Sequence, residues 1–320
     1  MTMRVFALFF ICIGFVFTAC EREQIMPSEF QLQQLVFSEQ TEIRDVKALN
    51  DSILFLCGGQ KNTHGFIYIS KDAGNTWTNA LTVDFSAINA LYVDEISGYW
   101  AVGDSLRIWH CPEPGGDWGL YEISNYPWDN YLIPYSAIYA WNRNEIIAVG
   151  GEFYQKGITS KTETGTYPWK QTSWDNEWFD LFVWDISNVL ISGYGQILYS
   201  DDRGKTFYDT ELYGDAFIAL KKNLYDEIFV LGEHGEVFRY NNQSWVSKAR
   251  LYGHLNDMAF SADYAILIGQ RGVMFFGDAH ANGFTKIEGF TDANLSLIYA
   301  HEDDFLIGTE DGNLYRLEHE

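Results

Sequence analysis

The sequence predicts an all-β fold, and three observations carry the prediction: aromatic-rich composition, a recurring strand that ends in glycine, and turn residues at regular intervals. The chain of 320 residues holds 11 Trp, 20 Tyr and 23 Phe, with 28 Gly and only 6 Pro. Aromatic residues favour strands, and 47% apolar with 20% charged residues is a globular composition. Helical repeats are therefore not expected.

The glycine-ended strand sets the architecture. Its copies are residues 55–58, 101–103, 148–150, 190–193, 230–232, 267–269 and 306–308. Their glycines are separated by 45, 47, 43, 39, 37 and 39 residues, which is the period of four-stranded propeller blades. An alternating strand precedes each copy, and a third strand follows each copy after a short polar loop. We therefore expect a seven-bladed β-propeller of four-stranded antiparallel blades over residues 29–320.

The last blade is one strand short, because the chain ends at Glu320, shortly after its third strand. Residues 30–37 precede the first blade and have the composition of a strand. Pairing this N-terminal strand with the last blade would close the ring and remove two exposed sheet edges. We expect that closure.

The first residues resemble a targeting signal. Residues 1–4 carry one arginine and residues 5–17 are apolar, a run of 13 residues where a membrane-spanning helix needs about 20. A signal peptide is therefore expected at 1–19 rather than a transmembrane helix. Residues 17–20 (Phe-Thr-Ala-Cys) resemble the bacterial lipobox, which implies lipidation, as with palmitate, at Cys20 and a tether over 20–28. We expect a lipid-anchored protein of the bacterial cell envelope, on the outer membrane or cell surface.

The charge excludes two classes of partner. The chain has 44 acidic against 21 basic residues, a net charge of −23. Nucleic acids and anionic lipid surfaces both require a basic face, so neither is an expected partner, and membrane contact should come through the anchor only. The seven histidines lack metal-ligand spacing, and no cofactor motif is present. We expect a monomer without metal or cofactor.

Two octapeptides share one pattern, Ser-Lys-Asp-Ala-Gly-Asn-Thr-Trp at 70–77 and Ser-Asp-Asp-Arg-Gly-Lys-Thr-Phe at 200–207. A carboxylate that accepts backbone N–H groups and a glycine with positive φ suit a tight hairpin, with the last aromatic packed on the blade. Both resemble the Asp-box (BNR) motif, for which we expect a structural role. The expected box residues are Ser70, Asp72, Gly74, Trp77, Ser200, Asp202, Gly204 and Phe207.

With the repeat, these boxes make residues 29–320 similar to propellers of the photosystem II stability/assembly-factor-like type and to sialidase-like propellers. Sialidases use an arginine triad, a tyrosine nucleophile with a glutamate partner, and an aspartate acid/base. Only Arg271 is expected in a loop that faces the central funnel, and one guanidinium makes a weak carboxylate clamp. No other catalytic motif is present. We lean towards a non-catalytic protein.

The candidate binding site is the channel mouth opposite the boxes, where the loops after the second and fourth strands gather. Aromatic faces beside polar groups suit sugar rings or peptides, although the tryptophans could instead pack between blades. The expected contact residues are Trp128, Tyr131, Trp174, Trp178, Tyr194, His234 and Arg271. The sequence thus predicts an exported binding or assembly scaffold for a protein partner or a glycan. The alternative is a glycan-active enzyme, hydrolase or lyase, that uses upper-loop carboxylates such as Glu152, Asp175 or Glu233.

Overall fold

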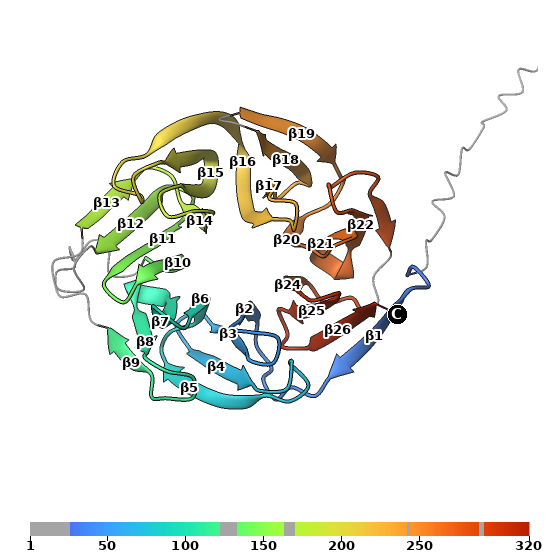
Figure 1. Cartoon of the computed structure of the whole chain (residues 1–320), viewed down its shortest axis with the longest axis horizontal. Helices are drawn as coiled ribbons and strands as arrows, with labels where there is room; N and C mark the ends of the chain where they lie inside the picture. The colour runs from blue at the N-terminus through green and yellow to red at the C-terminus, as the bar shows by residue number, and fades with distance from the viewer. Residues whose placement is uncertain (1–25, 122–132, 163–169, 242–243, 288–290, 320) are drawn as a thin grey trace, which may run out of the picture.

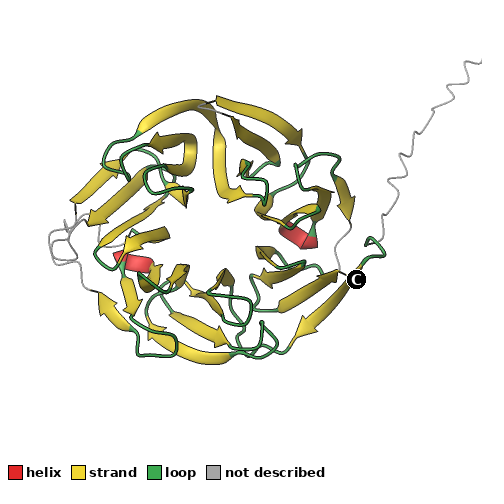
Figure 2. Cartoon of the chain, in the orientation of Figure 1, coloured by secondary structure: helices red, strands yellow, loops and turns green. Residues whose placement is uncertain are grey.

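The computed structural model describes residues 26–121, 133–162, 170–241, 244–287 and 291–319. Antiparallel sheets stand around a central axis like the blades of a propeller (Figure 1). Strands and loops make up nearly all of the described chain, with two short 3-10 turns, η1 (Asp104–Leu106) and η3 (Gln270–Gly272) (Figure 2). The all-β prediction is confirmed.

The innermost strands surround the axis. They are β2 (Ile43–Ala48), β6 (Ile88–Asp94), β10 (Tyr135–Asn142), β14 (Trp178–Val183), the second half of β16 (Tyr208–Lys222), β20 (Leu255–Phe260) and β24 (Leu295–His301).

The second and third strands lie between the innermost and outermost strands. The second strands are β3 (Leu54–Gln60), β7 (Gly98–Gly103), β11 (Glu145–Glu152), the first part of β15 (Val189–Ser200), β17 (Ile228–Gly232), β21 (Tyr264–Gly269) and β25 (Asp304–Thr309). The third strands are β4 (His64–Ser70), β8 (Ile108–Cys111), β12 (Lys156–Thr162), β18 (Glu236–Asn241), β22 (Met274–Asp278) and β26 (Leu314–His319). The outermost strands are β1 (Phe30–Leu35), β5 (Thr78–Asp84), β9 (Gly119–Tyr121), β13 (Lys170–Trp174), β19 (Ser244–Arg250) and β23 (Thr285–Ile287).

The prediction of seven blades is wrong, because the described strands form six sheets. Five have four strands, and the sixth joins β14 to β19 in sequence order as one six-stranded sheet. β16 pairs with β15 through its first half and with β17 through its second half, so the fourth and fifth sequence repeats share a strand. The polar, glycine-containing residues at 213–215, which suggest a boundary between blades, lie inside this long strand.

The N-terminal closure is present. β1 pairs antiparallel with β26, from Phe30 opposite His319 to Leu35 opposite Leu314, and completes the sheet β24–β25–β26. Of the expected tether, Met26 packs against the apolar cluster beneath β1. Cys20 and the expected signal peptide lie outside the described residues.

Close approach of backbones explains the repeated glycine. A Cβ atom added to Gly58 would overlap the carbonyl oxygen of Glu42, and one added to Gly103 would overlap that of Ala87. In both cases the carbonyl belongs to the residue just before the innermost strand of the same sheet. Glycine therefore lets the second strand run past the start of its neighbour.

Aromatic packing between neighbouring sheets forms the core. Phe55 on β3 stacks on Tyr99 of β7 with ring centroids 5.0 Å apart, and Phe229 on β17 stacks on Phe260 of β20 at 4.8 Å. These rings are nearly or fully buried. The high aromatic content therefore fills the wedges between blades, which fixes the channel and its two mouths.

Candidate functional site

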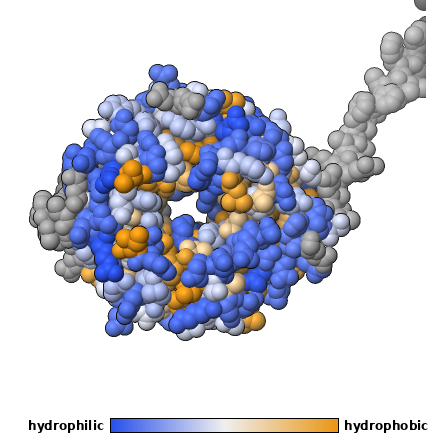
Figure 3. Space-filling model, viewed as in Figure 1, coloured by the Kyte–Doolittle hydropathy of each residue, from blue (hydrophilic) through white to orange (hydrophobic). Residues whose placement is uncertain are grey.

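An open channel runs along the axis. The space-filling view looks through it and shows apolar residues around the opening, within a largely hydrophilic rim (Figure 3). The cavity inside has a volume of about 180 Å³ and is lined by the innermost strands. Its shape leaves room for a few water molecules or a slender side chain.

Three aspartates in this lining connect neighbouring strands. Asp45 accepts the N–H of Leu91 at 2.8 Å, and Asp180 accepts that of Leu220, also at 2.8 Å. Asp257 accepts the N–H of Ile298 on β24 at 3.1 Å. Each lies at a register shift of its strand, where a bulge turns the carboxylate towards the next strand. These carboxylates hold the ring together.

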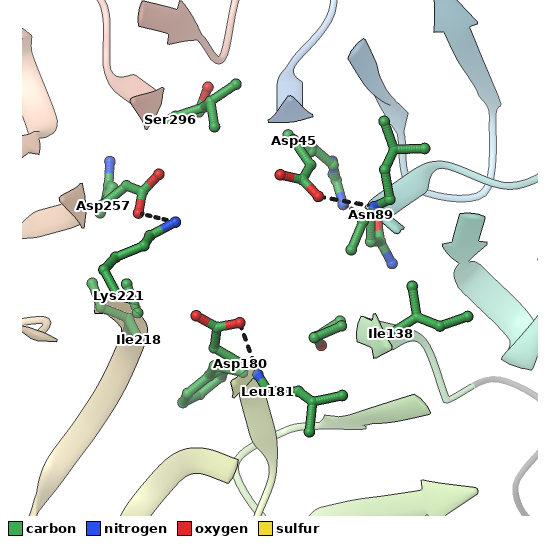
Figure 4. A pocket seen from close by; sticks show the side chains of 18 of the residues that line it. Asp45, Asn89, Ile138, Asp180, Leu181, Ile218, Lys221, Asp257 and Ser296 are labelled. Carbon is green, nitrogen blue, oxygen red and sulfur yellow. Dashed lines mark hydrogen bonds and ion pairs between the residues drawn. The ribbon is translucent and has the colours of Figure 1, made fainter. Parts of the chain in front are cut away.

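Two lysines pair with two of the three aspartates, and Figure 4 shows Lys221 beside Asp257. Lys47 Nζ lies 2.7 Å from Asp45, and Lys221 Nζ lies 3.1 Å from Asp257. Burial lowers the pKa of Lys221, but the carboxylates of Asp257 and Asp180 outweigh it, so the pKa is above its usual value. Burial raises the pKa of Asp180. The channel is thus a compensated charge network, which suits a structural role.

Four aromatic side chains are exposed at the channel mouth where β3, β7 and β11 end, three of them on loops and Tyr194 within β15. Their exposed fractions are 73% for Phe85, 68% for Phe153, 52% for Tyr154 and 38% for Tyr194. The rings of Tyr154 and Tyr194 lie 4.9 Å apart. We call these four residues the mouth aromatic group. Exposed aromatic rings gathered at one opening are typical of recognition surfaces.

Hydrogen bonds and an ion pair join the loops that carry this group. The N–H of Phe85 donates to Thr63 in the β3–β4 turn at 2.9 Å. In the same turn Lys61 forms an ion pair with Glu152, the residue before Phe153, at 2.8 Å. The loops of non-adjacent sheets are thereby held together at the mouth.

The backbone under three of these aromatics is strained. Phe85, Phe153 and Tyr154 all have φ of 61°, in the left-handed region that bulky residues rarely adopt. The carboxylate of Glu177 fixes the turn by accepting the N–H of Tyr154 at 2.7 Å. Burial raises the pKa of Glu177, although this hydrogen bond and Lys61 oppose the shift. Such strain is concentrated at functional sites in proteins.

The structure divides the predicted contact residues. Tyr194 lies at the mouth, whereas Trp178 is fully buried and forms no surface there. Trp174 packs edge-on against Trp178 at 5.5 Å and donates its indole N–H to Thr159 at 3.2 Å. Both tryptophans therefore occupy the packing role that the sequence left open, because they fill the space between β13 and β14. Trp128 and Tyr131 lie outside the described residues.

The remaining predicted contacts belong to polar loops. His234 Nε2 lies 3.4 Å from Asp215 and 3.3 Å from Glu233, and its ring is 5.1 Å from that of His254. Arg271 is exposed in η3 with φ of 56°. Neither residue contacts the mouth aromatic group through any bond between described residues. His234 instead lines a separate pocket of about 200 Å³ between β16 and β18.

The first octapeptide forms a hydrogen-bonded turn at the opposite end of the blades. Ser70 Oγ accepts the N–H of Gly74 at 2.8 Å, and Asp72 accepts the N–H of Thr76 at 2.8 Å. Gly74 has φ of 82°. Trp77 packs against the apolar cluster that includes β3 and β4. The Thr76 hydroxyl and N–H lower the pKa of Asp72 to about 2.

The second octapeptide repeats this geometry. Ser200 Oγ accepts the N–H of Gly204 at 2.8 Å, and Asp202 accepts that of Thr206 at 2.9 Å. Gly204 has φ of 75°, and the ring of Phe207 packs edge-on against a tryptophan at 6.0 Å. Burial raises the pKa of Asp202, but bonds from Thr206 and Ser200 outweigh it and lower the pKa to about 2. These aspartates serve backbone geometry.

Sequence reasoning missed Phe85 and Phe153. A signal exists for Phe153, because residues 153–155 (Phe-Tyr-Gln) connect two strands without the glycine or asparagine that such a turn prefers. Phe85 has no comparable signal, since its exposure depends on where the β3–β4 turn lies.

The described ranges hold neither a membrane-spanning helix nor a metal cluster. No helix among those residues is long and apolar enough to cross a membrane. Within the same residues, no group of three or more His, Cys, Asp and Glu side chains could hold a metal ion.

Comparison with known proteins gives the fold. No family model matches the chain, and no curated protein matches it. A solved structure of YCF48 bound to D1 peptide is similar, with a TM-score of 0.69 and 14% identity over 91% of this chain and 97% of that one. YCF48 from Cyanidioschyzon merolae has a TM-score of 0.68 and 13% identity, over 90% of this chain and 98% of that one. The WD40 β-propeller domain of Doa1 has a TM-score of 0.68 and 13% identity, over 91% of this chain and 97% of that one. The chain is a β-propeller similar to these structures.

Proposed function

We propose that this chain is a non-catalytic protein-binding propeller that receives a peptide segment of a partner at the mouth aromatic group. The observation that carries the proposal is the exposure of Phe85, Phe153, Tyr154 and Tyr194 at one opening, three of them on left-handed backbone. Exposing apolar rings and straining the backbone both cost stability, which a binding role explains. The similar propeller YCF48, solved bound to D1 peptide, supports a peptide ligand.

The pairing of upper-loop carboxylates supports a binding role over glycan chemistry. Glu152 is paired with Lys61, and Glu233 with His234. Glu177 has a raised pKa, but it holds the N–H of Tyr154. These carboxylates therefore shape loops, whereas glycosidases present one acid and one base to the substrate.

A peptide display library panned on the immobilised chain tests the proposal. Selected peptides are then titrated against the wild type and a Phe153→Asn, Tyr194→Ala variant, with Leu120→Ser, at an exposed position of the outermost strand β9, as the control. Peptides that lose affinity only in the mouth variant support the proposal. Peptides that bind all three chains equally contradict it, as does release of sugar from a panel of sialylated and neutral glycans.

We also propose that the chain is an exported lipoprotein, anchored through Cys20 to the cell envelope, and that its two Ser-x-Asp turns are Asp boxes. The apolar run at 5–17 before Thr-Ala-Cys supports the anchor, and the shared hydrogen bonds of Asp72 and Asp202 support the boxes. Expression in bacteria fed labelled palmitate should label the wild-type chain and leave Cys20→Ser unlabelled. Equal labelling of both chains would refute the anchor.

A further inference from the structure

Two adjoining grooves lie at the end of the ring opposite the mouth. β6 starts next to Phe85 at the mouth and ends at Asp94. The C-terminal ends of the innermost strands therefore lie on the face of the ring opposite the mouth. One groove, of about 380 Å³, lies among the ends of β6, β10 and β14. The other, of about 430 Å³, lies where β15, β16 and β18 meet.

Aromatic rings make the two grooves continuous. In the first groove Tyr139 contacts Tyr92 at 4.7 Å and Trp141 at 5.1 Å between centroids. Trp184 lines the first groove and contacts two rings of the second, Tyr199 at 5.9 Å and a further tyrosine of β18 at 6.1 Å. A ladder of aromatic faces therefore crosses several repeats. We call this surface the aromatic ladder groove.

Exposed aliphatic side chains border the ladder. Ile96 is 76% exposed and Ile186 is 67% exposed, each at the tip of the turn after an innermost strand. Both line the first groove, and Tyr208, 56% exposed, lines the second. The groove thus has solvent-exposed apolar walls, which is typical of docking surfaces.

The fixed charge of the groove is negative. Its lining includes carboxylates at Asp94, Asp185, Asp201, Asp209 and Glu211, and no described lining residue is a lysine or arginine. Burial raises the pKa of Asp94 and of Asp185, but backbone N–H bonds in each turn outweigh it and lower both pKa values. Asp94 and Asp185 are therefore ionised at neutral pH.

Two nearby cations, Lys161 and Arg203, already have partners. Lys161 lies 4.5 Å from the Trp141 ring centroid and 3.3 Å from Glu145. Arg203 pairs with the same Glu145 at 2.7 Å and donates its Nε–H to the carbonyl oxygen of Ile186 at 2.9 Å. Glu145 thus pairs with both cations, and the five carboxylates of the lining outnumber the one positive charge that remains.

A bulge in β16 presents one of these carboxylates. Ile197 on β15 faces the three residues between Asp209 and Tyr213. Glu211 lies at the centre of the bulge, exposed and with φ of 61°. Asp209 fixes it by accepting the Glu211 N–H at 2.7 Å and the Tyr213 hydroxyl at 2.6 Å. Bulges of this kind aim a side chain outward.

We infer that the aromatic ladder groove binds an extended basic segment of a protein partner, with arginine or lysine residues between aliphatic ones. Guanidinium groups stack on aromatic faces and pair with carboxylates, and aliphatic side chains fit beside Ile96 and Ile186. Charge complementarity selects this occupant over an acidic one. The site is distinct from the mouth aromatic group and does not depend on the function proposed there.

Titration of a short synthetic peptide of alternating arginine and leucine tests the inference, with isothermal calorimetry as the readout. A matched peptide with glutamate for arginine and a neutral oligosaccharide are the comparison ligands. The double variant Asp201→Lys, Glu211→Lys should weaken binding of the basic peptide roughly tenfold or more, and added salt should weaken it in the wild type. Leu120→Ser on the outermost strand β9, outside both surfaces, should leave this binding unchanged.

Three outcomes would overturn the inference. The first is no binding of the basic peptide, and the second is equal binding to the wild type and the charge-reversed variant. The third is preference for the oligosaccharide or the acidic peptide. Asp201 and Glu211 are exposed, so the thermal midpoint of the variant should match that of the wild type and rule out misfolding as the cause.

Discussion

Replacing Phe30 with alanine should destabilise the whole ring, because this residue anchors the closing strand. Its side chain is 5% exposed. The ring lies 5.0 Å from Tyr264, 5.2 Å from Phe276 and 5.1 Å from His319. These contacts connect β1 to its own sheet and to the preceding one.

The expected loss combines two effects. A buried phenylalanine side chain contributes about 1.5–3 kcal/mol by leaving water, and the cavity left behind adds to the cost. Measured phenylalanine-to-alanine changes in cores cost about 3–5 kcal/mol, and Phe30 fits that class because three rings surround it. We expect a loss in this range.

Urea unfolding monitored by tryptophan fluorescence measures the loss of unfolding free energy in Phe30→Ala. The matched control is Gln33→Ala, at an exposed position of the same strand opposite Arg316, which should change the free energy of unfolding by about 0.5 kcal/mol or less. A loss below about 1 kcal/mol for Phe30→Ala would show that β1 does not close the ring, because a core phenylalanine cannot be removed so cheaply.

Three further predictions concern charge, strain and the axis. The pKa of about 2 at Asp72 and Asp202 lies below the unfolded value of about 3.9. The stabilisation that these carboxylates give is therefore complete above about pH 4 and is lost as the pH falls towards 2. Urea midpoints of the wild type should fall over that window, and those of the Asp72→Asn, Asp202→Asn variant should fall less. An equal fall in both chains would contradict the turn geometry. Asp257→Ala leaves Lys221 without its ion pair and should cost about 2 kcal/mol in urea unfolding, whereas no loss would mean that the channel network is not structural. Phe153→Asn relieves the strain of a left-handed backbone at a bulky residue, so the thermal midpoint of unfolding should stay equal or rise. A clear drop in this midpoint would show that the Phe153 ring stabilises the fold by packing and is not kept for ligand binding.

The ring and its closure were predictable because both depend on local patterns. In five of the seven repeats the glycine of the second strand passes the carbonyl oxygen of the residue before the innermost strand, as at Gly58 beside Glu42. The number of sheets was not predictable. Tyr194 pairs with Ala216 across β15 and β16, so an extended chain replaces the loops that Gly195 and Gly214 suggest. Glycine marks where a turn is possible, and hydrogen bonds to a distant strand decide whether it forms.

The candidate site was predictable only in part. The sequence placed Tyr194 at the mouth, but it could not separate it from Trp178, whose burial depends on packing between β13 and β14. Alternation shows which residues share a face of a strand, but not how far the next sheet covers that face. The left-handed backbone at Phe153 lies beyond any pattern, because bulky residues rarely adopt it.

Site-specific photocrosslinking in cells tests the central claim most directly, that the mouth aromatic group binds a polypeptide. A photoreactive phenylalanine replaces Phe85, Phe153 or Tyr194 in turn, with the exposed Leu120 as the control position. The account predicts a crosslinked protein from the mouth positions and none from the control. Mouth positions that crosslink no polypeptide, or no more than the control position does, would contradict it.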